Sequence, residues 1–235
     1  MKTLGYWDDI DSKLVELVKS GYVKLPSLGI FELDEVAKQI NAEMNGNTFS
    51  ESCLSHQAFL QNLGLDKNLT AKLFKIARDV FGYKGDISNQ YHIARLVEPG
   101  NSKEMFRAHF DSHLFTLVLP LKIPELLSGG TIGDLIYFPK ARKAPKSEIS
   151  NFLSKAYYKR FASKEGLQNF AKGHTRYTDN FRDSSPLLFV GNTTLHTNKQ
   201  VSEHCSSYRL TLLAHFFDPG PKYGVGGLVR MLRSR

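Results

Sequence analysis

The stretch Arg107-Ala-His109-Phe-Asp111-Ser-His113-Leu-Phe-Thr-Leu-Val-Leu-Pro120 decides how the rest of this chain is interpreted. It ends in a long apolar run, which is typical of a buried β-strand. Successive side chains of a strand alternate between its two faces, so a strand through this stretch would direct His109, Asp111 and His113 to one side. A histidine and a carboxylate placed in this way can hold one metal ion together.

A third candidate ligand, His196, lies far downstream in Leu188-Phe-Val-Gly191-Asn-Thr-Thr-Leu195-His196-Thr197. Two histidines and one carboxylate that hold one face of an octahedral metal ion leave its other coordination positions open. Further along, Arg209 and Thr211 lie on another apolar run and would share one face of a strand. A planar guanidinium can bind both oxygens of a carboxylate, so this pair suits an anionic ligand in a dry pocket.

The order of these motifs resembles the Fe(II)/2-oxoglutarate-dependent oxygenases. Residues 115–121, 128–131 and 137–139 look like the prolyl-hydroxylase-type arrangement, and residues 20–26 look like the opening strand of phytanoyl-CoA-hydroxylase relatives. The resemblance covers roughly residues 14–218 and does not settle on one subfamily. It implies a double-stranded β-helix, or jelly-roll, core.

The resemblance also implies a chemistry for each candidate residue. His109, Asp111 and His196 would bind Fe(II), and the open positions would take the keto-acid end of 2-oxoglutarate and O₂. Arg209, assisted by Thr211, would hold the far carboxylate of 2-oxoglutarate. The implied activity is that of a hydroxylase, which releases succinate and CO₂. Because the acidic ligand occupies the place that a halide would need, halogenation is not expected.

His113 has an alternative interpretation as a metal ligand in place of His196, which would give a hydrolase-like His-x-Asp-x-His site. The favoured interpretation is that His113 lines the substrate side of the pocket, or that it is a buried histidine hydrogen-bonded to the backbone. His204 and His215 follow the family's ligand position and are interpreted as structural. His215 also stands where nucleic-acid demethylases of the superfamily carry a second arginine.

Two tyrosines that prolyl-hydroxylase relatives often carry near the first motif are absent from this chain. Residues 96–99, before the Gly100 turn, contain no tyrosine, and Phe106 replaces the other one. We therefore expect Tyr91 or Thr116 to supply the missing hydroxyl group to 2-oxoglutarate.

The composition of the chain favours one globular domain. Its 235 residues, 41% of them hydrophobic, can bury a full core. No apolar run reaches the ~18–20 residues that a membrane span needs. The start of the chain has no secretory apolar region, and the two cysteines, Cys53 and Cys205, do not form a disulfide framework. A cytoplasmic location is therefore expected.

The predicted architecture is mainly β with flanking helices. Residues 1–87 would form an N-terminal helical support packed outside the sheet, with helices over 8–20, 33–44 and 70–81. The jelly-roll core would span residues 88–218. A helical insertion over residues 140–185 would hang over the metal site, and residues 219–235 would form a basic tail. Within the insertion, a helix capped by Ser147 would bury Phe152, Leu153, Tyr157 and Phe161 along one side and solvate its lysines.

The net charge of +8 is concentrated in two places. Residues 140–176 carry 10 basic and 2 acidic side chains, and the tail carries 4 basic side chains and no acidic one. Cations at the rim of a cleft attract anions. The insertion is therefore expected to favour an anionic substrate, unless its charges only solvate exposed helices. The candidate rim residues are Arg142, Lys143, Lys159, Arg160 and Arg176, and Arg107, His113 and Arg176 are candidates for substrate contact.

Other functional classes compete with an oxygenase. The first alternative is a jelly-roll module without catalysis that binds an anionic sugar or lipid head group, although a complete ligand set argues against lost chemistry. The second is a nucleic-acid-binding protein, because aromatic residues of the basic segment could stack on bases. We expect a small-molecule, sugar-linked or lipid-linked anionic substrate instead, with peripheral membrane contact as a further option. The sequence predicts no particular oligomeric state.

Overall fold

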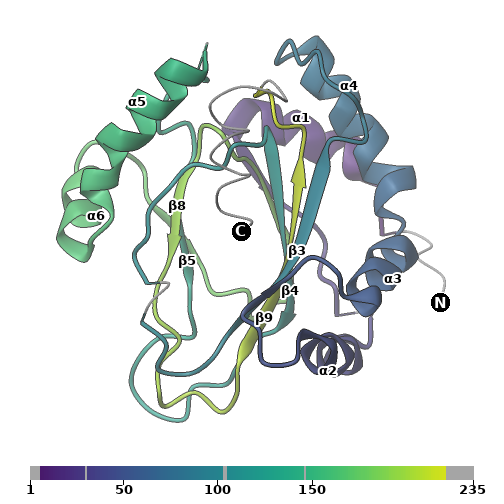
Figure 1. Ribbon diagram of the computed structural model, residues 1–235, viewed down its shortest axis with the longest axis vertical. Helices are drawn as coiled ribbons and strands as arrows, with labels where there is room; N and C mark the ends of the chain where they lie inside the picture. The colour runs from purple at the N-terminus through teal and green to yellow at the C-terminus, as the bar shows by residue number, and fades with distance from the viewer. Residues whose placement is uncertain (1–5, 30, 103–104, 146, 221–235) are drawn as a thin grey trace.

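The chain folds into two facing antiparallel β-sheets with helices on their outer sides (Figure 1). The computed structural model describes residues 6–29, 31–102, 105–145 and 147–220. The larger sheet has six strands in the order β1-β7-β4-β9-β3-β2, and the smaller sheet has three in the order β6-β5-β8. The mainly β jelly-roll core predicted from the sequence is therefore confirmed. The strands are β1 Tyr22–Lys24, β2 Phe49–Ser50, β3 Gln90–Val97, β4 Phe115–Lys122, β5 Leu135–Phe138, β6 Tyr177–Asp179, β7 Leu187–Val190, β8 Leu195–Asn198 and β9 Arg209–Phe216.

The helices of the N-terminal third cover the outer face of the larger sheet (Figure 1). They lie close to the predicted positions, and Gly21 ends the first of them in a left-handed conformation with φ 85°. Their apolar stripes and the outward residues of the sheet share one buried core, which fixes the sheet from behind. The helices are α1 Ile10–Ser20, α2 Leu33–Met44, α3 Leu54–Leu63 and α4 Ala71–Asp79, with a short π-helical turn at Asp66–Thr70.

The alternation of β9 decides which residues face the space between the sheets. Its even-numbered residues from 210 to 216 belong to the core under the helices. Its odd-numbered residues, 209 to 215, therefore face the smaller sheet. Strands β3 and β4 flank β9 and are paired with it residue by residue, so their side chains alternate in step. The inner face of this central trio carries the polar residues of the candidate site.

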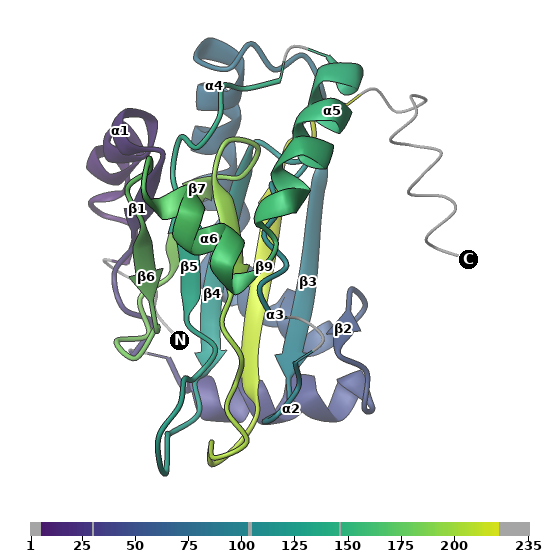
Figure 2. The same cartoon turned by 90° about the vertical axis from the view of Figure 1, so that its left-hand side faces the viewer.

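The insertion forms two helices, α5 Glu148–Tyr158 and α6 Lys164–Ala171, joined by a 3₁₀ turn at Lys159–Phe161. They pack on the outer face of the smaller sheet, as Figure 2 shows from that side. The insertion reaches the segment of the metal ligands through α5, where Tyr158 packs edge-on against Phe110 with ring centroids 4.8 Å apart. Its C-terminal part adds β6 to the smaller sheet, a strand that the sequence analysis did not predict.

The predicted burial is wrong for Phe152, Leu153 and Tyr157 of α5, whereas Phe161 packs against the apolar cluster under the insertion, as predicted. Ser147 caps the helix as expected, by accepting a hydrogen bond from the Ser150 amide. However, the side chains of Phe152, Leu153 and Tyr157 are 69%, 61% and 53% exposed. The helix rests on the protein through its polar side instead, so its apolar side faces outward.

No helix within the described ranges is both long and apolar enough to cross a membrane. From residue 221 onward, the basic tail predicted for residues 219–235 lies outside the described residues.

A partly buried histidine makes the stability of the fold depend on pH. His92, on β3, points its ring edge at Phe216, and its Nδ1 atom is buried without a hydrogen-bond partner. Burial lowers the pKa of His92 to about 4 from an ordinary value of 6.5. Between these pH values the unfolded chain binds a proton at this residue and the folded chain does not. The contribution of His92 to the unfolding free energy is therefore fully present above pH 6.5 and is lost as the pH drops toward 4.

We expect the metal-free protein to lose about 2 kcal/mol of unfolding free energy between about pH 7 and about pH 5 through this group alone. Denaturant unfolding in the presence of a chelator measures the loss at both pH values. His92→Phe should reduce this pH dependence, because the new side chain does not titrate. His204→Gln is the matched control, since His204 is an exposed histidine. An identical pH dependence in the wild type and His92→Phe would contradict the prediction.

Candidate metal centre

Backbone pairing brings the three predicted ligands together. His109 and His196 exchange both backbone hydrogen bonds at 3.0 Å, which places their side chains next to each other. The backbone amide of Asp111 donates to the carbonyl of Gly191 at 3.2 Å. The sequence analysis expected a continuous strand here. The structure instead has an isolated bridge at His109, and the regular strand β4 begins only at Phe115.

One possible ligand atom from each of His109, Asp111 and His196 lies within 4.8 Å of the other two. The Nε2 atom of His109 is 3.6 Å from Oδ1 of Asp111, and that of His196 is 3.7 Å from Oδ2. The carboxylate therefore lies between the two imidazoles with one oxygen directed toward each. His113 is not a member of this group. Two nitrogen donors and one oxygen donor fit a non-haem Fe(II) ion.

The other nitrogen of each imidazole is held by the backbone. Nδ1 of His109 lies 2.8 Å from the carbonyl of Arg107, and Nδ1 of His196 lies 3.1 Å from the carbonyl of Thr194. A carbonyl only accepts, so Nδ1 carries the proton and Nε2 keeps a free lone pair. Metal-binding histidines are usually oriented by such second contacts. The arrangement therefore fits a metal ion near Asp111, where both Nε2 atoms point.

The carboxylate of Asp111 is itself held in place. Thr116 donates its hydroxyl proton to Oδ2 of Asp111 at 2.5 Å, and Nδ1 of His215 lies 3.1 Å from the Thr116 oxygen. Burial alone would raise the pKa of Asp111, but the imidazoles of His196, His215 and His109 and the Thr116 hydroxyl hold it well below its usual range. Asp111 is thus ionised at neutral pH, as a metal ligand must be.

These contacts bear on two residues. Thr116 hydrogen-bonds the acidic ligand, while its predicted contact with 2-oxoglutarate stays a prediction. His215, interpreted from the sequence as structural, has its Nδ1 atom 3.9 Å from Oδ2 of Asp111 and belongs to the same polar network. Thr116 and His215 are direct cross-strand partners on the inner face, a contact that alternation within each strand does not show without the register between β4 and β9.

We expect Thr116→Val to weaken Fe(II) binding by about 10- to 100-fold, which is the usual effect of removing an outer hydrogen bond to a ligand. Valine keeps the branched shape but leaves Oδ2 of Asp111 without its donor. Competition with a chromophoric chelator measures the affinity. Thr178→Val, on the exposed side of β6, is the control and should bind Fe(II) as the wild type does. Unchanged affinity in Thr116→Val would show that the hydroxyl does not support the ligand.

A stack of rings lines the inner face beside the triad. The rings of His113 and His215 lie 5.2 Å apart at 27°, and that of Tyr91 lies 5.8 Å from His215 at 20°. The Tyr91 hydroxyl donates to Glu51 at 2.7 Å. Tyr91 pairs with His215 across β3 and β9. The expectation that Tyr91 supplies a hydroxyl group to 2-oxoglutarate stays a prediction.

Arg209 is a buried cation, with its whole residue only 3% exposed. Its Nη1 atom donates to the carbonyl of Gly133, and its guanidinium lies 5.5 Å from the ring centre of Phe181. Burial, reinforced by the positive charge of Arg95, lowers the pKa of Arg209 to about 9. Among the described residues no carboxylate forms an ion pair with it. An anion held by Arg209 and its strand neighbour Thr211 would complete this environment.

A second arginine on the inner face was missed by the sequence analysis. Arg95 of β3 is the cross-strand partner of Thr211, so its side chain leaves the sheet on the same side as Arg209. Its guanidinium lies 5.7 Å from the ring centre of Phe49 in the neighbouring strand. The alternation of residues 90–97 contained this information, but it became usable only with the register to β9.

The residues predicted to contact substrate are placed apart. Arg107 lies beside the triad, with an exposed side chain and a carbonyl that orients His109. His113 stacks on His215, as described above. Arg176 is exposed just before β6, on the side of the smaller sheet. The structure thus brings His113 and Arg107 to the candidate centre but does not bring Arg176 into contact with it.

Some of the basic residues of the insertion hold the fold together. Arg142 donates to the carbonyl of Asn192 at 2.8 Å, and its guanidinium lies 3.9 Å from the ring centre of Phe110. Lys155 donates to the hydroxyl of Ser112 at 3.2 Å, directly after Asp111 in the chain. Arg142, predicted to be a free rim cation, instead connects α5 to the loop that follows β7. The helix is thereby anchored next to the ligand segment.

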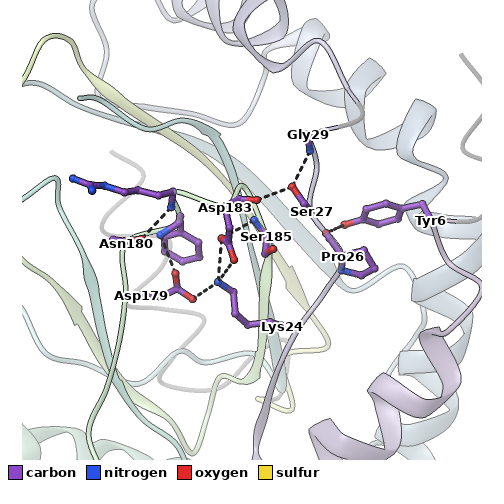
Figure 3. Close-up of polar contacts among 11 residues, drawn as sticks. Tyr6, Lys24, Pro26, Ser27, Gly29, Asp179, Asn180, Asp183 and Ser185 are labelled. Carbon is purple, nitrogen blue, oxygen red and sulfur yellow. Dashed lines mark hydrogen bonds and ion pairs between the residues drawn. The ribbon is translucent and has the colours of Figure 1, made fainter. Parts of the chain in front are cut away.

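An ion-pair network closes the sandwich near Arg209. Figure 3 shows Lys24 of β1 pointing at Asp179 and Asp183, with Nζ to carboxylate distances of 2.9 and 3.0 Å. Two cations lie near the Phe181 ring. The Nζ atom of Lys24 is 5.9 Å from the ring centre, and the Arg209 guanidinium is 5.5 Å from it. A cavity of about 510 Å³ opens next to this network and is lined by Lys24 and Asp179 among others. Lys24 is paired with two carboxylates here, whereas the Arg209 guanidinium has no carboxylate partner among the described residues.

Known structures share this arrangement of sheets and helices. A prolyl-4-hydroxylase from Pseudomonas putida aligns over 88% of this chain and 97% of its own, with a TM-score of 0.50 and 13% identity. A prolyl 4-hydroxylase from Phytophthora capsici aligns over 94% of this chain and 70% of its own, with a TM-score of 0.52 and 13% identity. The non-haem α-ketoglutarate-dependent epimerase SnoN of nogalamycin biosynthesis aligns over 92% and 87%, with a TM-score of 0.50 and 13% identity.

No protein-family model matches the sequence, and no curated protein matches it. The chain has the jelly-roll fold of the Fe(II)/2-oxoglutarate-dependent oxygenases. At this low identity, the likeness shows the fold, and the chemistry rests on the residues described above.

Proposed function

We propose that this protein is an Fe(II)- and 2-oxoglutarate-dependent oxygenase that hydroxylates an anionic substrate and releases succinate and CO₂. The observation that carries the proposal is the pairing of two features on one inner surface. A His-Asp-His group has its lone pairs directed to one point, and a buried arginine has no carboxylate partner among the described residues. The likeness in fold to prolyl hydroxylases and to an α-ketoglutarate-dependent epimerase supports it.

Each residue has a defined task in this proposal. His109, Asp111 and His196 hold the metal, and the carboxylate balances part of its charge. Arg209 and Thr211 bind and orient the far carboxylate of 2-oxoglutarate by a bidentate, charge-assisted contact. Bound Fe(II) with 2-oxoglutarate would supply the oxidative activation of O₂. The apolar walls around Arg209, including Phe181, exclude water from the carboxylate and so strengthen its electrostatic binding.

The anionic character of the substrate is proposed from charge. Arg95 lies on the same inner face as Arg209, and the imidazoles of His113 and His215 line that face toward the metal. The insertion adds exposed cations on the outer side of the smaller sheet. Such a concentration of donors favours a phosphate- or carboxylate-bearing substrate, free or linked to a sugar or lipid.

The proposal is tested by succinate formation. The purified chain is incubated with Fe(II), 2-oxoglutarate and O₂, without and with a panel of phosphorylated and carboxylated acceptors. Slow succinate release without acceptor, and faster release with one class of acceptor, is the expected result. Asp111→Ala is the control and should release none above background. If wild-type and Asp111→Ala proteins release succinate equally, or neither does with any acceptor, the proposed chemistry is wrong.

A further inference from the structure

Helix α5 has its polar side turned toward the protein and its apolar side turned toward solvent. Its inner side makes hydrogen bonds: Asn151 and Ser154 accept from Arg142, Lys155 donates to Ser112, and Tyr158 donates to the carbonyl of Ala141. Surface helices normally bury the apolar face and solvate the polar one. This helix is well anchored and correctly capped, so its reversed orientation leaves an apolar surface that the described part of the chain does not cover.

The outer side of α5 carries three large side chains in a row. Phe152, Leu153 and Tyr157 are each more than half exposed. Arg160 follows them in the 3₁₀ turn, with its guanidinium 3.7 Å from the ring centre of Tyr157 and 4.7 Å from that of Phe161. We refer to Phe152, Leu153, Tyr157 and Arg160 as the α5 patch. Aromatic and leucine side chains beside a cation are typical of helices that lie in a membrane interface.

The surroundings of the α5 patch are strongly cationic. Among the residues of 140–176 whose side-chain exposure the structure describes, the exposed charged side chains are one carboxylate, Glu165, and seven cations. These cations are Lys140, Lys143, Lys159, Arg160, Lys164, Lys172 and Arg176. Each Lys or Arg near an anionic membrane adds to the electrostatic attraction. An anionic surface therefore complements the patch in charge, while its apolar residues gain from leaving water.

We propose that the α5 patch and the cations around it dock this protein on the surface of a membrane that contains anionic lipids. A second copy of the chain is a poorer occupant, because a symmetric contact through α5 would bring Lys159 and Arg160 against the same residues of the other copy. Since α5 also contacts Ser112, docking holds the ligand segment of the candidate metal centre near the lipid surface. The inference does not depend on the proposed chemistry.

The test is flotation of the full chain with vesicles of phosphatidylcholine alone and of phosphatidylcholine mixed with phosphatidylglycerol. The wild type should float with the anionic vesicles and remain behind with the neutral ones. Replacing Phe152, Leu153 and Tyr157 together by Ser should lower the bound fraction at least about tenfold, because three interfacial side chains are lost. Lys159→Glu with Lys164→Glu should lower it by a similar factor and remove the dependence on phosphatidylglycerol.

Matched controls separate the patch from other apolar residues and from the tail. Val15→Ser with Leu54→Ser removes two side chains that are 70% and 74% exposed on α1 and α3, and should leave flotation unchanged. All variants keep residues 221–235, so any loss is due to the insertion. Folding is checked by thermal unfolding, which exposed substitutions should hardly alter.

Two results would overturn the docking proposal. The first is a wild-type protein that does not float with anionic vesicles, or whose flotation is the same in the triple Ser variant. The second is self-association of the wild type in sedimentation velocity that the triple Ser variant abolishes without any change in flotation. That outcome would assign the α5 patch to a protein contact instead.

Discussion

Replacing Asp111 by Ala should weaken Fe(II) binding at least about 100-fold, because it removes the only oxygen donor of the triad and the charge between the two imidazoles. His109 and His196 would then face each other across a space with no carboxylate to balance the metal. Calorimetric titration of Fe(II) under anaerobic conditions measures the change. The effect should exceed that of Thr116→Val, which leaves all three donors in place.

Asp134→Ala is the matched control for this variant. Asp134 is also a partly buried carboxylate on the smaller-sheet side, but its partner is Lys199 at 2.8 Å and it is not a member of the triad. Its loss should therefore leave Fe(II) affinity within about twofold, well below the 1.4 kcal/mol that corresponds to a factor of ten. Full Fe(II) affinity in Asp111→Ala, with a cooperative unfolding transition retained, would rule out Asp111 as a ligand.

Arg209→Met should raise the dissociation constant for 2-oxoglutarate about 100-fold, which corresponds to about 3 kcal/mol for losing one partner of a buried charged contact. Methionine retains the apolar volume beside Phe181 but provides no donor. Arg209→Lys should have an intermediate effect, because it keeps the charge and loses the planar fork. Fe(II) affinity should hardly change in either variant, since Arg209 is not in the triad.

Arg182→Met serves as the control for Arg209, because Arg182 is exposed and lies next to Phe181 in the chain. It should bind 2-oxoglutarate as the wild type does. An unchanged affinity for 2-oxoglutarate in Arg209→Met would show that the buried guanidinium has a structural role. A parallel loss of Fe(II) binding would indicate a general collapse of the site.

The clustering of the metal triad and the strand position of Arg209 were predictable from the sequence. His109 and Asp111 are separated by one residue, His196 follows the buried Leu195 in β8, and Arg209 begins the mostly apolar strand β9. The helices at 10–20, 33–44 and 71–79 were predictable for the same reason, since each has a clear apolar stripe and a stop signal.

The support around the triad was not predictable, because it depends on the register between distant strands. Thr116 and His215 meet only when β4 and β9 pair, and Arg95 meets Thr211 only when β3 and β9 pair. One residue of slip would send each of these side chains to the opposite face. The position of Tyr91 beside His215 was not predictable for the same reason.

The predicted orientation of α5 was wrong because amphipathicity alone does not show which side of a helix packs against the protein. The sequence has apolar residues on one side, and burial of that side was the natural expectation. In the structure, the hydrogen bonds that Arg142 makes with Asn151 and Ser154 fix the opposite side inward. A single sequence gives no information on such a long-range preference.

The central claim is that the triad and Arg209 form one site for Fe(II) and 2-oxoglutarate. Anaerobic titration of 2-oxoglutarate into the Fe(II)-loaded chain, followed by visible absorption, tests it most directly, because a keto acid that chelates ferrous iron gives a charge-transfer band. We predict a band that saturates at one equivalent per chain in the wild type, needs much more 2-oxoglutarate in Arg209→Met, and is absent in Asp111→Ala. A chain that takes up Fe(II) but shows no band at saturating 2-oxoglutarate, or a band unaffected by both substitutions, would contradict the claim.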